Sequence, residues 1–247
     1  MDRSLYIAMN GAKQTLMAQS ANANNLANAQ TTGFKSDFEQ FRAMPSFGPG
    51  YPSRVYSMTE RPGTDLSNGS IYHTGRELDV AVEGQGWIAV TGKDGKEAYT
   101  RAGDLRLTPE GLLQTGAGLS VLGEAGQPIA VPPAQKVEIG KDGTISIVPQ
   151  GVNATNTVLV DRIKLVSADP ANLEKLEDGL MHPKQGGVLP ADANVTLVQG
   201  SLESSNVNAM AAMVEMIELS RSFDMQSKVM KDIDENAAAA AKLMQVA

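Results

Sequence analysis

Apolar side chains near the start of the chain recur at alternating intervals of four and three residues. This spacing places them along one stripe of an α-helix and is typical of helices that pack against other helices. We therefore predict an N-terminal assembly helix within residues 1–35, ending near Gly33, where glycine can take the left-handed conformation that closes a helix. The stripe consists of Leu5, Met9, Ala12, Leu16, Gln19, Ala23 and Leu26.

Two apolar stripes run along residues 201–247, which contain neither glycine nor proline. If residues 201–243 form one helix, it is about 60–65 Å long at ~1.5 Å per residue, more than the diameter of a small domain. We expect its apolar surface to need the N-terminal helix, other chains, or both. One stripe holds Val207, Met210, Val214 and Ile217; the other holds Met213, Met216, Ser220, Phe223, Ser227 and Met230; Val229, Ile233, Asn236, Ala240 and Leu243 continue the rhythm.

Short runs of Val, Ile and Leu separated by glycines fill the middle of the chain and predict β-strands. Asp-Gly pairs at 94–95 and 142–143 lie between such runs and predict hairpins. Residues 169–173 are expected to form a short helix capped by Asp169. We therefore predict a β-rich domain over residues 76–200, with strands at 77–82, 87–90, 97–100, 105–108, 112–115, 119–122, 158–166 and 195–198.

Prolines alternate with aromatic residues between positions 44 and 74. Pro45, Pro49, Pro52 and Pro62 are interleaved with Phe47, Tyr51, Tyr56 and Tyr72. We interpret residues 36–75 as an extended arm stiffened by proline; an irregular loop lying on its own domain would explain the same residues. The predicted fold class is α+β, with terminal helices packing as a coiled-coil-like pair around an inserted, mainly antiparallel β domain.

Composition narrows the classes of function. The chain has 28 acidic and 21 basic side chains and a net charge of −7, which argues against a nucleic-acid partner. Without cysteine it has no disulfide, thiolate metal site or cysteine nucleophile. Aromatic residues make up 4%, so we expect a core of aliphatic side chains and Met. The first residues do not resemble a cleaved secretory signal.

Candidate chemistry is sparse. His73 and His182 have no neighbouring cysteine, carboxylate pair or second histidine. Gly84 and Gly86 precede a predicted strand rather than a helix, so they lack the helix N-terminus that would hold a phosphate. Asp79 and Glu83 belong to a predicted strand whose polar face explains them without catalysis. We expect no enzymatic activity, metal, cofactor or small-molecule substrate.

Motifs at both ends of the chain resemble the signatures of bacterial flagellar rod and hook proteins. They are MDRSLYIAMNGA at 1–12, NNLANAQTTGFK at 24–35, SSNVN at 204–208, MVEMI at 213–217 and RSFDM at 221–225. In the middle, TGRELDVAV at 74–82, GQGW at 84–87 and YTRAG at 99–103 resemble the central domain of the same family. The resemblance extends over nearly the whole chain, and its motifs occur in the family's order.

The resemblance implies a structural subunit of the flagellar basal body. Such proteins pass unfolded through the flagellar type III export apparatus without signal cleavage and assemble into a hollow helical rod in the periplasm. The terminal helices would line the tube, with the β domain outside. The implied partners are copies of the chain, other rod proteins and surrounding basal-body rings. The start, residues 50–56 and the length favour a proximal-rod type over a distal-rod or hook relative.

Both the stripes and the resemblance identify candidate assembly residues. They are Leu5, Met9, Ala12, Leu16, Asn24, Asn25, Leu26, Asn28, Phe34, Tyr51, Tyr56, Asn206, Val207, Met210, Val214, Ile217, Phe223, Val229 and Ile233. Asn24, Asn25 and Asn28 either fix subunit register or simply end the helix. A peptidoglycan-acting periplasmic enzyme and a secreted adhesin or filament protein are the alternatives of a different class.

Overall fold

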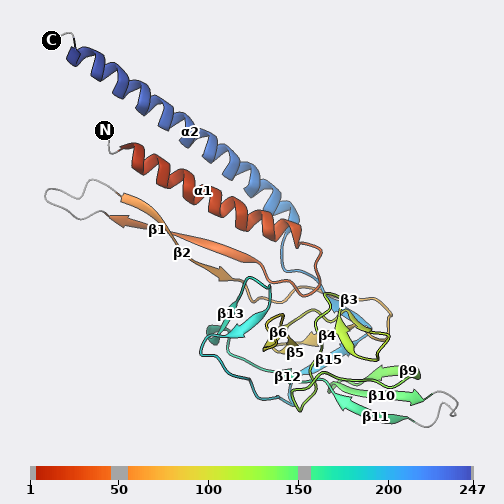
Figure 1. The fold of residues 1–247 in the computed structure, drawn as a ribbon. Helices are drawn as coiled ribbons and strands as arrows, with labels where there is room; N and C mark the ends of the chain where they lie inside the picture. Colours follow the sequence, from red (N-terminus) through yellow and green to blue (C-terminus); the bar gives the residue numbers. More distant parts are fainter. Residues whose placement is uncertain (1–3, 46–54, 150–156, 246–247) are drawn as a thin grey trace. The chain divides into compact units, whose positions relative to one another are not determined.

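The computed structural model describes residues 4–45, 55–149 and 157–245 (Figure 1). The chain divides into two compact units. The helical unit consists of Met1–Ala29, Ser36–Asp65 and Val207–Ala247, and the β unit consists of Gln30–Lys35 and Leu66–Asn206. Both terminal segments therefore belong to the same unit, as the predicted helix pair requires.

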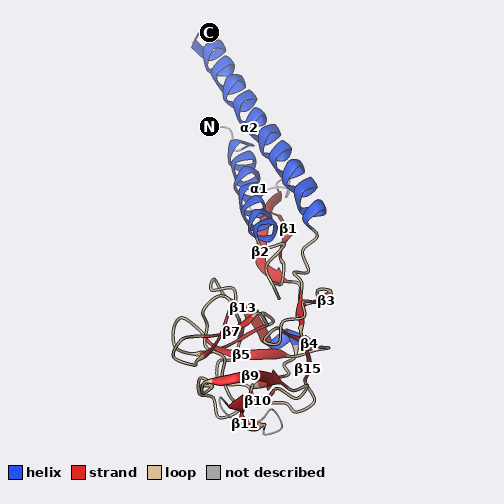
Figure 2. Ribbon diagram, turned by 90° about the vertical axis from the view of Figure 1, so that its right-hand side faces the viewer, coloured by secondary structure: helices blue, strands red, loops and turns tan. Residues whose placement is uncertain are grey.

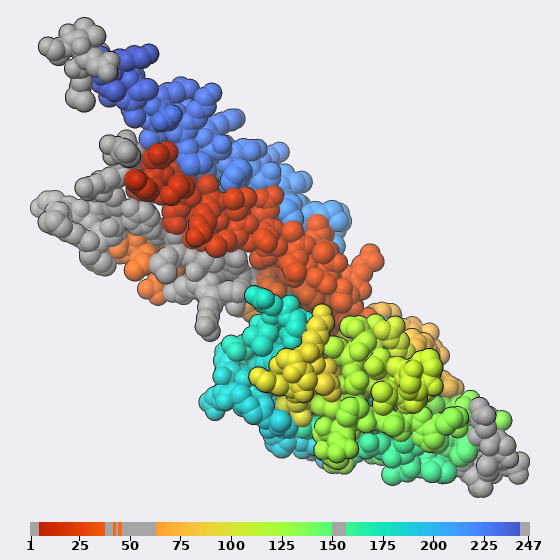
Figure 3. Space-filling model, in the orientation of Figure 1, coloured from red at the N-terminus to blue at the C-terminus, as the bar shows by residue number. Residues whose placement is uncertain are grey.

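In the helical unit, α1 (Ser4–Ala27) packs against the longer α2 (Ala209–Gln245), and the space-filling view shows the two in contact (Figure 3). A long antiparallel hairpin of β1 (Asp37–Pro45) and β2 (Val55–Thr64) contacts α1. The chain between positions 36 and 65, predicted as an extended arm or an irregular loop, therefore contains a paired hairpin. Residues 46–54, including Tyr51, lie outside the described residues.

Both helices are shorter than the sequence patterns predict. The expectation that α2 would begin at residue 201 is wrong, because Asn208 caps the helix: its side-chain oxygen accepts the N–H groups of Met210 and Ala211, each at 3.1 Å. At the other terminus, α1 ends at Ala27 rather than near Gly33. The Asn28 amide nitrogen donates to the carbonyl of Asn24 at 2.9 Å in that last turn.

The β unit is built from antiparallel pairs (Figure 2). Its five-stranded sheet has the order β12 (Leu165–Val166), β5 (Trp87–Thr91), β6 (Glu97–Thr100), β14 (Met181–Pro183), β13 (Leu173–Lys175). The three-stranded sheet is β11 (Val158–Arg162), β10 (Thr144–Pro149), β9 (Ala134–Ile139). Two-stranded pairs are β4 (Val80–Glu83) with β15 (Thr196–Gln199), β3 (Ile71–His73) with β16 (Ser201–Glu203), and β7 (Leu105–Leu107) with β8 (Leu113–Thr115).

Most of the predicted turns and strands are present. The two Asp-Gly pairs form the hairpins β5–β6 and β9–β10, with Gly95 at φ +77° and Gly143 at φ +84°. Asp169 caps the short 3₁₀ helix Pro170–Asn172. The strand predicted over 158–166 is divided into β11 and β12, and within the strand predicted over 119–122 residues 120–122 form isolated bridges instead.

The interior of the β unit is aliphatic, as the low aromatic content predicts. Its larger cluster is centred on buried side chains such as Val80, Ile88, Leu105 and Ile145. A smaller cluster surrounds Trp87 and contains the buried Tyr99. Because the cores of these clusters lie within the β unit, the helices contribute little to them.

Substitution of Gly33 tests how closely the segment after α1 packs against the backbone of the β unit. At φ +66°, a Cβ on Gly33 would lie 2.3 Å from the carbonyl carbon of Arg101. Gly95 has a similar φ of +77° but open space around it. Gly95→Ala should therefore cost only the left-handed strain of about 1–2 kcal/mol, whereas Gly33→Ala should cost more because the backbone must also move. Urea unfolding followed by Trp87 fluorescence measures both; equal losses would contradict the close contact.

Candidate functional site

The buried side chains of α1 and α2 are small or polar. Ala12, Thr15, Ala18 and Asn22 are the buried side chains of α1 within its described part, and Ala212 is buried on α2. The Asn22 amide nitrogen donates to the carbonyl of Ala212 at 2.8 Å. A hydrogen bond buried between two helices fixes their register.

The same seam continues toward the start of α1. Gln226 donates from its amide nitrogen to the Thr15 hydroxyl at 3.2 Å, and that hydroxyl donates to the Gly11 carbonyl at 3.1 Å. A Cβ on Gly11 would lie 3.2 Å from the Gln226 side-chain oxygen, so glycine permits this approach. Small residues and amides therefore join the helices closely while burying little apolar area.

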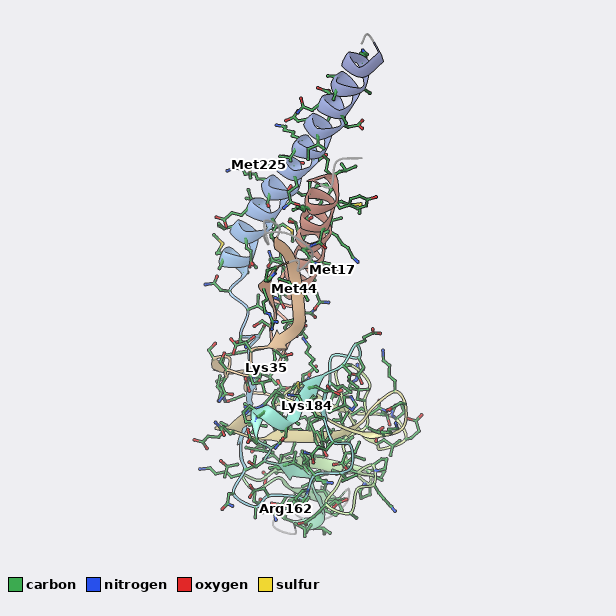
Figure 4. All side chains as sticks on the ribbon, turned by 90° about the vertical axis from the view of Figure 1, so that its left-hand side faces the viewer. Met17, Lys35, Met44, Arg162, Lys184 and Met225 are labelled. Carbon is green, nitrogen blue, oxygen red and sulfur yellow. The ribbon has the colours of Figure 1, made fainter. Side chains whose placement is uncertain are left out.

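Large apolar side chains of the helical unit are instead exposed. On α1, Met9 is 54% exposed, and on α2 Val214 and Ile217 are 57% and 55% exposed. Met225 likewise projects from the side of α2 that faces away from α1 (Figure 4). A helix pair in a soluble monomer ordinarily shows the reverse, with its apolar stripe buried. This apolar outer surface is the candidate functional site, and its exposed members are Leu5, Tyr6, Met9, Leu16 and Met17 on α1 and Met210, Met213, Val214, Ile217, Met225 and Val229 on α2.

The structure places the sequence-predicted assembly residues in three settings. Leu5, Met9, Leu16, Asn24, Met210, Val214, Ile217 and Val229 are exposed; Asn25, Leu26, Asn28, Phe34, Asn206, Val207, Phe223 and Ile233 are half-buried; Ala12 is buried. Tyr56 lies on β2, but its side chain, like Tyr51 as a whole, is outside the described residues. Three of the larger members of the predicted α1 stripe, Leu5, Met9 and Leu16, thus lie on the apolar outer surface.

Asn25 has a role within the chain that the sequence did not reveal. Its amide nitrogen donates to the Asp37 carbonyl at 2.5 Å, and its amide oxygen accepts the Asp37 N–H at 2.9 Å. This pairing imitates the bonding of a neighbouring strand and joins the beginning of β1 to α1. The hairpin is therefore positioned by an asparagine of the N-terminal motif.

A buried cluster of charges in the β unit was also missed by sequence reasoning. The Glu203 carboxylate accepts from Lys35 Nζ at 2.7 Å and from Arg101 Nη1 at 2.9 Å, and these side chains are at most 3% exposed. Arg101 also lies over the Trp87 ring, 5.3 Å from its centroid. Lys35 and Arg101 fall in the motifs that resemble rod proteins, but nothing in the sequence pairs them with Glu203.

A second buried ion pair has a structural role. Lys164 Nζ donates to both Glu97 carboxylate oxygens, at 2.7 and 2.9 Å. The Tyr99 hydroxyl donates to Glu97 at 2.9 Å and accepts the N–H of Leu189 at 2.8 Å. Desolvation by burial, together with the Glu97 carboxylate, raises the pKa of Tyr99 far above its usual value. The phenol therefore stays protonated and acts as a structural donor.

The two carboxylates weighed as catalytic candidates have ordinary structural partners. Asp79 is buried, accepts the Thr74 hydroxyl at 2.7 Å and lies 3.4 Å from Arg76 Nη1. Glu83 is exposed and accepts the Thr196 hydroxyl at 3.2 Å. Among the described residues, no three His, Cys, Asp or Glu side chains are grouped as metal ligands would be. Within the same part of the chain, no helix is long and apolar enough to cross a membrane.

Asn22→Ala tests the seam between the helices. Losing the bond to Ala212 should lower the stability of the helical unit by about 1 kcal/mol. Asn24→Ala is the matched control: its side chain is exposed on the same helix, and it makes the same change in helix propensity. Thermal unfolding followed by circular dichroism at a helix-sensitive wavelength measures both. Equal effects of the two substitutions would show that Asn22 does not couple the helices.

Comparison with known protein families gives three matches. Residues 5–35 match the "Flagella basal body rod protein" model, which covers most of α1 and the segment after it. Residues 81–147 match "Flagellar hook protein FlgE/F/G D1 domain". Residues 198–243 match "Flagellar basal body rod FlgEFG protein C-terminal", which spans β16 and most of α2.

Curated relatives are similar along the full length of the chain. The flagellar basal-body rod protein FlgF of Escherichia coli is 42% identical over 99% of both chains, and that of Salmonella typhimurium is 40% identical over the same shares. The flagellar basal-body rod protein FlgG of Bacillus subtilis is 32% identical over 95% of this chain and 96% of its own.

Proposed function

We propose, because the chain belongs to the flagellar basal-body rod protein family, that it is a structural subunit of the rod and occupies its proximal part. The observation that carries this function is the apolar outer surface of the helical unit. The proximal-rod type that the sequence motifs resemble is FlgF. The two FlgF relatives are 42% and 40% identical to the chain and the FlgG relative is 32% identical, which supports the proximal position. No observation favours a catalytic function.

The apolar outer surface needs a covering layer. Burying one such side chain is worth roughly 1.5–3 kcal/mol, so leaving Met9, Val214 and Ile217 in water forgoes several kcal/mol. Apolar patches of this kind mark protein interfaces. The proposed covering layer consists of helices from neighbouring copies and from other rod proteins.

Helical assembly follows if these contacts are head-to-tail. A contact that joins two different surfaces of one subunit type builds a filament when the rotation does not close into a ring. Exposed apolar residues occur on both α1 and α2, so each subunit offers surfaces to more than one neighbour. In the proposed rod the terminal helices line a channel for exported subunits, and the assembled shaft transmits torque from the motor to the hook.

The predicted organisation and route of the chain remain part of the proposal. The helices α1 and α2 serve as the assembly segments, the stretch 36–75 that bears Tyr51 and Tyr56 serves as the arm, and residues 76–200 serve as the outer β domain. The subunit passes unfolded through the flagellar type III export apparatus, without signal cleavage, to the periplasmic portion of the basal body, where rings surround the rod. The contact between α1 and α2 buries little apolar area, so keeping the two helices apart during export costs little free energy. This supports the proposed route.

Ile217→Asp tests the apolar outer surface. Because Ile217 is exposed, the purified monomer should keep its circular dichroism spectrum, whereas a buried carboxylate at a subunit contact should abolish assembly. Leu26→Asp should have the same effect on assembly. Glu218→Gln, the exposed neighbour, is the control and should swim normally in soft agar. Normal swimming of both aspartate variants would contradict the proposed interface.

The free monomer should have a weakly protected helical unit. Its seam buries small and polar groups, whereas the β unit has a complete aliphatic core, so amides of α1 and α2 should exchange hydrogen faster than amides of β5, β8 and β10. Hydrogen exchange of the purified full chain measures the difference. Helices as well protected as the β strands would count against assembly-dependent folding.

A further inference from the structure

The polypeptide passes between the two units at four places, which involve three segments of the β unit. These are residues 30–35, where the chain both enters and leaves the β unit, and the two ends of residues 66–206. Any force exchanged through the chain must enter the β unit through these segments. How they are joined therefore decides how the β unit resists load.

Main-chain hydrogen bonds join the three segments to one another. The Gly33 N–H donates to the Glu203 carbonyl at 2.9 Å, and the Asn206 N–H donates to the Phe34 carbonyl at 3.3 Å. On the other side, the Ser204 N–H donates to the Ser70 carbonyl at 2.8 Å, continuing the β3–β16 pairing. The segment around Glu203 thus lies between the other two and is bonded to both.

The Glu203 side chain makes the same connections a second time. Its Oε1 accepts Lys35 Nζ at 2.7 Å and the Gly69 N–H at 3.0 Å. Lys35 Nζ also donates to the Ser67 carbonyl at 2.8 Å. One carboxylate, 1% exposed, therefore contacts both neighbouring segments.

Arg101 connects this carboxylate to the chain just after β4. It donates from Nη1 to Glu203 Oε2 at 2.9 Å and from Nη2 to the Gly84 carbonyl, beside β4, at 2.7 Å. Burying three charges carries a large desolvation cost, so such a cluster contributes less to stability than to specifying one arrangement. The β unit already has an aliphatic core to stabilise it.

We propose that Glu203 is a positioning residue that ties residues 30–35, 66–70 and 203–206 into one mechanical junction anchored on Arg101. Load passing between the helical unit and the β unit in the assembled rod is then shared among the segments instead of pulling on one. The tie itself follows from the contacts of the β unit, whereas its load-bearing role rests on the proposed function.

Hydrogen exchange of the full chain tests the tie. In the unmodified protein, the amides of Gly33, Ser204 and Asn206 should open together, with one common dependence on denaturant. Glu203→Gln keeps the shape but removes the charge, and should speed exchange at these three amides by about 10- to 100-fold. The Leu113, Val121 and Ile129 amides, bonded within the β unit, should change by less than about 3-fold.

Two further variants make the result specific. Glu97→Gln removes the charge from another buried carboxylate, which is paired with Lys164, and should leave the three junction amides unchanged. If Glu203→Gln does not fold, Lys35→Met is tested in its place. This variant leaves the Arg101–Glu203 pair intact and should speed hydrogen exchange at the amides of Gly33 and Asn206 more than at the amide of Ser204. Independent opening of the three amides, or equal acceleration of junction and core amides, would overturn the proposal.

Swimming under load tests the mechanical role. Cells carrying Glu203→Gln should assemble flagella and swim in ordinary medium, but should lose more speed in viscous medium than cells carrying Glu97→Gln. Equal speeds at high viscosity would overturn the load-bearing role. If deleting the gene for this chain left swimming intact, the proposed function would fail, while the exchange result on the purified protein would still decide the tie.

Discussion

The close approach of α1 and α2 is the constraint on which the rest of the helical unit depends. Gly11, Ala18 and Ala212 leave room between the helices, and Asn22 fixes their register through the Ala212 carbonyl. Because these close contacts are made by small residues, large side chains such as Met9, Val214 and Ile217 lie exposed on other faces. The apolar outer surface is thus a direct consequence of the way in which the two helices pack, and it turns a helix pair into a building block for larger assemblies.

The β unit meets a different requirement, because its interior is complete. Aliphatic side chains from β4, β5, β7 and β10 form one core, and the buried pairs of Glu97 with Lys164 and Glu203 with Arg101 and Lys35 add specific connections. A domain with its own core can fold before its neighbours arrive. The chain therefore combines a unit with its own core and a unit whose apolar surface, in the proposed rod, is covered by other subunits.

Much of this arrangement is readable from sequence, and the exceptions have physical causes. Glycine turns predicted the hairpins at Gly95 and Gly143, because a left-handed φ has a local signature. The start of α2 was misplaced, since residues 201–203 continue an uninterrupted breaker-free run but are buried beside β3. The Lys35–Glu203 pair joins residues 168 apart in sequence, and nothing local indicates such a contact. The apolar spacing predicted both helices but not the face of α1 that packs against α2. That face includes the polar residues Thr15 and Asn22, which a hydrophobic pattern does not mark.

The division between a polar seam and an apolar outer surface also determines when the helical unit becomes stable. Hydrogen bonds such as Asn22 to Ala212 contribute about 1 kcal/mol each, whereas fixing each backbone residue of a helix costs about 1–2 kcal/mol of conformational entropy. Most of the compensating burial is available only when neighbours cover residues such as Met9 and Ile217. Anything that binds only the folded state stabilises it in proportion to its concentration and affinity. In the proposed assembly, the end of a growing rod presents such partners at high local concentration, so the helices of an arriving subunit would gain their stability at the site of assembly.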